Sequence, residues 1–219
     1  MKSYWNKAFT LILVGLGSSA HCQTAQEILA QTQETWNGIR DYRCQMQSNN
    51  RLGQEKDLKK IDFAFKREHQ VRMEVLDGKS KGSVLTRNDS GRIKGKKGGI
   101  LGVVAVTLDE TDERIFNLRG RKFYEADWGT VIEEFAGRIR AGWTVEVQGE
   151  EEVSGSQCHA IVATGRETGS RISKDIMCVD KQRHLVLRRK QYEGEDLVNE
   201  VVWWDIQINP TLSDELFSL

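Results

Sequence analysis

The amino-acid sequence predicts an α+β fold in which a strongly curved antiparallel sheet, an unclosed β-barrel of about 9–11 strands, holds two main helices in or over its concave face. Two stretches repeat hydrophobic residues every three or four positions, which is the helical period. Most of the remaining chain alternates hydrophobic and polar residues, with turn residues between the alternating stretches. A sheet of so many twisted strands cannot stay flat, and we expect it to curl around the helices.

The length and composition are those of one globular domain. The chain has 219 residues, of which 38% are hydrophobic and 29% are charged, enough for a core. Its 32 Lys and Arg balance 32 Asp and Glu, so there is no dominant basic field to hold a nucleic acid. We therefore expect no nucleic-acid partner.

Residues 1–22 have the pattern of a cleaved signal peptide. Lys2 and Lys7 precede the apolar run 8–17, and small residues follow it at 18–20. The run is too short to span a membrane, which takes about 20 residues in a helix. We expect residues 23–219 to form a single domain in the periplasm, not transmembrane after cleavage.

Two cleavage points fit this pattern, after Ala20 or after Cys22. We do not expect lipidation at Cys22, because His21 stands where a lipoprotein cut normally has a small residue.

The first helical stretch lies between Thr24 and Tyr42, and the second covers about 127–140. Thr24 and Glu27 have the spacing of a capping box, in which each residue's side chain accepts a hydrogen bond from the other's backbone amide. Strand-like alternation occupies most of the rest. The expected strands lie at 42–46, 61–65, 71–75, 82–87, 92–96, 143–148, 157–163, 174–179, 185–191 and 197–209.

Two glycine-containing segments stand out near the middle of the chain. Residues 91–99 (GRIKGKKGG) lack the spacing of a phosphate-binding loop, so we interpret them as a solvated basic hairpin or a patch that touches anionic headgroups. Residues 98–108 (GGILGVVAVTL) are apolar, and we expect a buried strand there; the alternative is a flap over a cavity.

No motif indicates catalysis. The four histidines, at 21, 69, 159 and 184, are far apart and lack metal-ligand spacing, and no Gly-x-Ser-x-Gly elbow occurs. We expect no catalytic residue, no metal, no cofactor and no enzymatic activity.

Several segments of the chain together form a recognisable pattern. They are 36–44 (WNGIRDYRC), 62–66 with Val71-Arg72-Met73, 82–91 (GSVLTRNDSG), Val179-Asp180, 185–188 (LVLR), Tyr192 and 201–217 (VVWWDIQINPTLSDELF). With them the chain resembles the LolA/LolB/RseB-like superfamily of bacterial envelope proteins, and most closely an uncharacterised LolA-like family, over nearly all of 23–219. The resemblance implies an unclosed barrel lined and lidded by helices, and a periplasmic carrier or sensor with an apolar cavity for acyl chains or a lipidated peptide.

The more apolar face of each strand should point into the concavity, where unfilled space would take a lipid acyl chain or a lipidated protein. On the last strand this parity turns Trp204 inward and Trp203 outward. An envelope protein partner, bound without lipid, is the alternative. The expected cavity residues are Trp36, Phe63, Phe65, Met73, Val75, Phe135, Val145, Val202, Trp204 and Ile206.

A disulfide between Cys158 and Cys178 is also expected. A turn centred on Thr168 would set the two residues directly opposite each other in a hairpin, within disulfide reach. Cys44 then stays free, or pairs with Cys22 if the cut follows Ala20. The alternative is three separate buried thiols.

Overall fold

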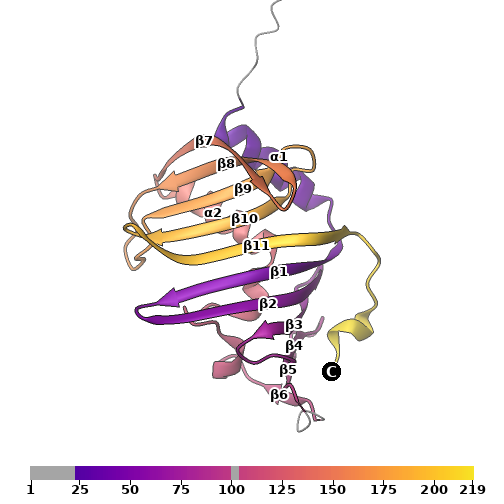
Figure 1. Cartoon of the computed structure of the whole chain (residues 1–219). Coiled ribbons are helices and arrows are strands. Elements are labelled where there is room, and N and C mark those ends of the chain that lie inside the picture. The colour runs from indigo at the N-terminus through magenta and orange to yellow at the C-terminus, as the bar shows by residue number, and fades with distance from the viewer. Residues whose placement is uncertain (1–22, 100–103) are drawn as a thin grey trace, which may run out of the picture.

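The computed structural model describes residues 23–99 and 104–219, so the expected signal peptide lies outside the described residues. Within them, eleven strands form one antiparallel sheet in the order β6-β5-β4-β3-β2-β1-β11-β10-β9-β8-β7 (Figure 1). The first and last strands therefore pair in the middle, and the edge strands β6 and β7 do not meet. The predicted α+β fold with a curved, unclosed sheet is confirmed.

The strands are longest at the centre of the sheet, where β1, β2 and β11 pair, and shortest toward the β6 edge. Their bounds are β1 Asp41–Leu52, β2 Glu55–Lys66, β3 Gln70–Gly78, β4 Val84–Arg87, β5 Ile93–Lys96, β6 Val106–Leu108, β7 Thr144–Val153, β8 Ser156–Thr164, β9 Lys174–Asp180, β10 Val186–Glu193 and β11 Asp196–Ile208.

Two α-helices form where the sequence predicts them. In α1 (Ala25–Asn37) the Thr24 hydroxyl accepts from the Glu27 amide at 3.2 Å and the Glu27 carboxylate accepts from the Thr24 amide at 2.7 Å, the predicted capping box. Before α2 (Trp128–Arg140), the Asp127 carboxylate accepts from the Thr130 amide at 3.1 Å. Helix α2 lies behind the sheet in the view of Figure 1, and we call that side of the sheet its inner face.

An aromatic cluster joins the helices to the inner face. The ring centroids of Tyr42 and Trp128 lie 4.2 Å apart in a stacked pair, and the Trp128 backbone amide donates to the Tyr42 hydroxyl at 3.3 Å. Trp36 of α1 packs on Phe65 of β2 with 5.2 Å between ring centroids. These rings fill the concavity beside α1 and α2, so this part of the interior is solid.

The end of the chain is tied to the middle of the sheet. The Asn209 side-chain oxygen accepts from the Arg40 amide at 2.7 Å, and the Asn209 amide donates to the Asp41 carbonyl at 2.8 Å. A 3-10 turn, η3 (Asp214–Phe217), then buries Phe217. This arrangement ends β11 and returns the chain toward β3 (Figure 1).

The segment 98–108 departs from the expectation of a buried strand. Of the residues of this segment that the structure describes, three form a strand, β6; Leu108 is buried, while Val104 is 73% exposed and Val106 is 41% exposed. Residues 100–103 lie outside the described residues. For the rest the prediction is wrong, because β6 is the edge strand and pairs only with β5.

Within the described residues, no helix is long and apolar enough to cross a membrane.

Candidate functional site

A cavity of about 650 Å³ lies between the β6 half of the inner face and the segment that joins β6 to α2. That segment contains the 3-10 turns η1 (Glu113–Ile115) and η2 (Phe123–Ala126). The lining residues come from β1 to β6, β10 and β11, from the turns between them, and from α2. They are Met46, Ser48, Asn50, Asp57, Lys59, Ile61, Met73, Val75, Ser80, Lys81, Ser83, Leu85, Gly95, Lys96, Lys97, Gly98, Val104, Val106, Leu108, Arg114, Ile115, Phe116, Asn117, Arg121, Lys122, Phe123, Ala126, Val131, Arg189, Asn199, Val201 and Trp203.

The deep wall of the cavity is apolar. Met46 of β1 and Ile61 of β2 lie opposite each other in the sheet, and Trp203 of β11 lies opposite Met46 on the other side. Ile115 and Val131 cover them from η1 and α2, and all five side chains are buried. Alternate residues of a strand share one face, so the sheet places this row of apolar side chains in the concavity.

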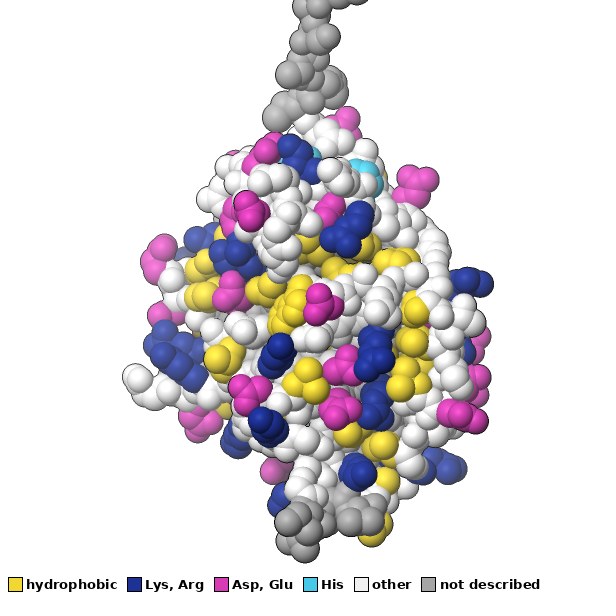
Figure 2. Space-filling model, turned by 45° about the vertical axis from the view of Figure 1, so that its right-hand side comes forward, with side chains coloured by type: hydrophobic (Ala, Val, Ile, Leu, Met, Phe, Trp, Pro, Cys, Tyr) yellow, Lys and Arg dark blue, Asp and Glu magenta, His cyan; other side chains and the backbone are white. Residues whose placement is uncertain are grey.

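The charged residues of the lining are almost all basic, although the whole chain has equal numbers of basic and acidic residues. The outer surface mixes basic and acidic side chains, as Figure 2 shows for one face. Asp57 is the single acidic residue among the lining residues that the structure describes. The basic ones are Lys59, Lys81, Lys96, Lys97, Arg114, Arg121, Lys122 and Arg189.

A largely buried ion network borders the cavity, to whose lining it contributes Arg121 and Arg189. Arg189 of β10 is 1% exposed and donates to Asp175 of β9 at 3.0 and 2.6 Å and to Glu134 of α2 at 2.6 Å. Glu134 also pairs with Arg121 at 2.9 Å, and Arg138 pairs with Asp175. Three guanidinium groups thus share two carboxylates, of which Asp175 is fully buried and Glu134 is 39% exposed.

The pKa values in this network follow from burial and charge. Burial, together with the charge of Arg189, lowers the pKa of Arg138 to about 10. Burial also lowers the pKa of Arg121, which Glu134 only partly offsets. Burial raises the pKa of Glu134, but the charges of Arg189 and Arg121 outweigh it and the net shift is downward. Arg138, Arg121 and Glu134 are therefore charged at neutral pH.

Two turns meet at the mouth of the cavity. Gly98, which follows β5, lies against the turn between β3 and β4: a Cβ placed on it would lie 2.1 Å from the Lys81 carbonyl oxygen and 2.7 Å from the Gly82 carbonyl carbon. Only glycine can stand at position 98, because the two backbones approach so closely. The contact holds Lys81 beside the segment that carries Lys96 and Lys97.

The ten residues expected to form the cavity fall into three groups. Met73 and Val75 line it. Trp36, Phe63, Phe65 and Phe135 are buried in the hydrophobic core under the helices, and Val145 lies on the distant strand β7. Val202, Trp204 and Ile206 of β11 are half-buried and do not line it.

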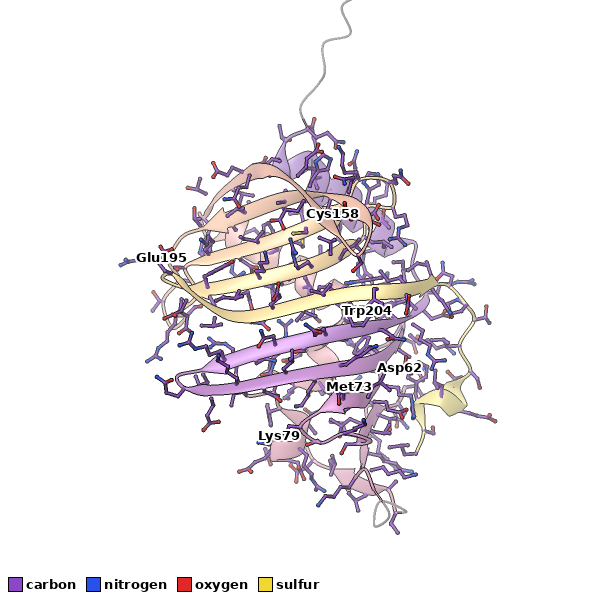
Figure 3. All side chains as sticks on the ribbon, in the orientation of Figure 1. Asp62, Met73, Lys79, Cys158, Glu195 and Trp204 are labelled. Carbon is purple, nitrogen blue, oxygen red and sulfur yellow. The ribbon has the colours of Figure 1, made fainter. Side chains whose placement is uncertain are left out.

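The parity predicted for β11 is wrong. Trp203, not Trp204, faces the cavity and is 1% exposed, whereas Trp204 lies on the outer face, where Lys60 sits 5.5 Å from its ring centroid (Figure 3). The apolar residues at even positions suggested the opposite orientation. The outer face of β11 is itself apolar, and a bulge at Asp205, with φ of 51°, breaks the alternation before Ile206.

The register expected for the hairpin of β8 and β9 is also wrong. Cys158 lies opposite Asp180 and Cys178 lies opposite Ala160, so the two cysteines are diagonal neighbours, farther apart than a direct pair. Cys44, Cys158 and Cys178 are buried free thiols, which is the alternative to the expected disulfide. Burial raises the pKa of Cys158 to about 11 and that of Cys178 to about 12, so both are protonated and unreactive at neutral pH.

Sequence reasoning missed the residues that distinguish this cavity from the core. Arg189 and Asn199 are polar residues on inward faces, and Ile115 and Phe123 belong to 3-10 turns without a long periodic pattern. No local pattern marks Arg189, because Arg188 and Lys190 are its immediate neighbours and the polar Gln191 follows it on the same face of the strand.

Solved structures of low sequence identity share this architecture. MucB matches with a TM-score of 0.55 and 16% identity, over 89% of this chain and 62% of MucB. The MucA/MucB complex of Pseudomonas aeruginosa matches with a TM-score of 0.51 and 17% identity, over 87% of this chain and 59% of that chain. An uncharacterised conserved protein from Thermus thermophilus matches with a TM-score of 0.51 and 13% identity, over 89% of this chain and 93% of that chain.

A LolA superfamily protein from Nitrosomonas europaea also matches, with a TM-score of 0.38 and 12% identity, over 90% of this chain and 99% of that chain. No family model and no curated protein sequence matches the chain. The chain shares its fold with MucB, which is consistent with the LolA/LolB/RseB-like fold that the resemblance implies, and at these identities the likeness concerns the fold alone.

Proposed function

We propose that the protein is a non-enzymatic binding protein of the bacterial envelope whose cavity holds the acyl chain of a lipid or of a lipidated protein. The observation that carries the proposal is the cavity itself. Its volume of about 650 Å³ lies within the range of roughly 300–1,000 Å³ that is usual for ligand sites, and its deep wall is apolar.

The energetics fit an acyl chain. Each methylene removed from water contributes about 0.8 kcal/mol, so a chain of about fourteen contributes roughly 11 kcal/mol. Association costs at least about 4 kcal/mol. The remainder corresponds to a dissociation constant in the micromolar range without any polar recognition.

Binding of an envelope protein partner is the second candidate function. It is favoured by the shared fold with MucB, which has been solved in complex with MucA, and by the exposed side chains of Leu52 and Leu58 at the β1–β2 hairpin. In this case the cavity would be unnecessary, so a test of the cavity distinguishes the two. We also propose that the protein lies in the periplasm.

Filling the cavity should abolish binding. We expect Val201→Trp to lose saturable binding of a fluorescent fatty acid, because Val201 lines the cavity and the larger ring would occupy the space of the chain. Val202→Trp is the matched control, since Val202 is its neighbour on the outer face. The measurement is a fluorescence titration of purified residues 23–219, with thermal unfolding to show that both variants fold.

If wild type and Val202→Trp bind the fatty acid and Val201→Trp does not, the proposal holds. If wild type shows no saturable binding, or if Val201→Trp binds as well as wild type, the acyl-chain proposal fails and the partner-binding function takes its place.

A further inference from the structure

The charge of the cavity lining points to the chemistry of the ligand. The lining carries eight basic residues and one acidic residue among those described, in a chain whose charges balance overall. A concave site with charges of one sign and apolar walls raises the local concentration of the opposite charge. An acyl chain alone would not need this asymmetry.

Most of these basic groups already have acidic partners. Lys59 pairs with Asp57 at 2.7 Å, and Lys122 pairs with Glu110 at 2.6 Å. Arg114, Arg121 and Arg189 also pair with carboxylates, and Lys81 has a weak exposed pair with Asp77 at 3.8 Å. Lys96 and Lys97 are the two basic lining residues without an ion pair to any residue that the structure describes.

These two lysines lie where the cavity lining changes from charged to apolar, which is the change that the head group and the chain of an amphiphile require. Both are exposed at the end of β5. One position earlier, Gly95 lies against the side chains of Leu85 and Leu108, and all three residues line the cavity. Lys97 follows Gly95 by two positions, which is the spacing of residues on one face of a strand, and Lys96 lies between them at the edge of the cavity, so the charged mouth adjoins the apolar wall.

We propose that the bound amphiphile carries an anionic head group, a carboxylate or a phosphate, which Lys96 and Lys97 hold at the mouth while its chain lies in the cavity. This inference rests on the function proposed above. Lys81, held beside them by the contact of the two turns, adds a third ammonium group. A neutral lipid would form no ion pair with these ammonium groups.

Three ligands with the same chain length test the head group. Palmitate, hexadecyl phosphate and methyl palmitate are titrated below their aggregation limits by displacement of a neutral fluorescent probe, N-phenyl-1-naphthylamine. For wild type we expect both anions to bind about tenfold more tightly than the neutral ester, since hydrogen bonds to charged groups are the stronger ones. The tighter anion identifies the head group as carboxylate or phosphate.

The double variant Lys96→Gln/Lys97→Gln should bind methyl palmitate as wild type does and lose the preference for the anions. The matched control is Lys56→Gln/Lys60→Gln, which removes the same charge from two exposed β2 residues outside the lining. Equal affinity of wild type for the ester and the anions would overturn the inference, and so would an equal loss in the control variant. If none of the three ligands displaces the probe, the acyl-chain function itself fails.

Discussion

Replacing Asp175 with Asn should destabilise the protein by about 3–5 kcal/mol, the usual result of removing one partner from a buried ion pair. Asp175 is fully buried and accepts from Arg189 through both of its carboxylate oxygens, from Gln191 at 3.3 Å, and pairs with Arg138. Without its charge, Arg138 would lose its ion pair and Arg189 would keep only Glu134, which already pairs with Arg121.

Glu151→Gln is the control for this substitution. Glu151 also pairs with two basic residues, Arg188 and Lys190, but its side chain is 33% exposed. Solvent screens such pairs, and we expect a loss of about 1 kcal/mol or less. Urea unfolding measures the free energy of unfolding of both variants. If Asp175→Asn loses no more of it than Glu151→Gln does, the network is not a buried one.

Trp203→Ala should cost about 3–5 kcal/mol, whereas Trp204→Ala should cost about 1 kcal/mol or less. The two residues are neighbours of identical chemistry, and they differ in the face of β11 on which they lie. Trp203 is 1% exposed beside Met46 and the cavity, and Trp204 is half-buried under Lys60. The substitution at 203 removes a buried ring, and the one at 204 removes an outer cation–π contact.

Urea unfolding of the two variants measures this difference directly. Equal losses, or a larger loss for Trp204→Ala, would reverse the assignment of the inner face. In that case Val201 would not face the cavity either, and Val202 and Trp204 would, as the apolar pattern first suggested.

Local patterns in the sequence predicted the order of the elements well. The capping box at Thr24 and Glu27, the second helix and the strand alternation of Phe63, Phe65 and Met73 all follow from nearest-neighbour chemistry, and the structure has them as expected. Each of these signals depends only on residues a few positions apart.

The cavity depends on relations that no local pattern contains. Both faces of β11 carry hydrophobic residues, so a majority of apolar positions does not indicate which face is the interior one. The register of β8 and β9 is not set by a short turn, because nine residues connect them, and a small shift separates Cys158 from Cys178. The wall formed by η1 and η2 has no periodicity to detect.

The central claim is that the cavity around Met46, Ile61 and Trp203 holds one acyl chain. The most direct test is native mass spectrometry of the protein purified without detergent from the envelope of its own cells, followed by lipid analysis of the same sample. The account predicts one bound acyl-chain compound per wild-type and Val202→Trp molecule, and none on Val201→Trp. Wild-type protein without any bound lipid, or lipid retained equally by Val201→Trp, would contradict it.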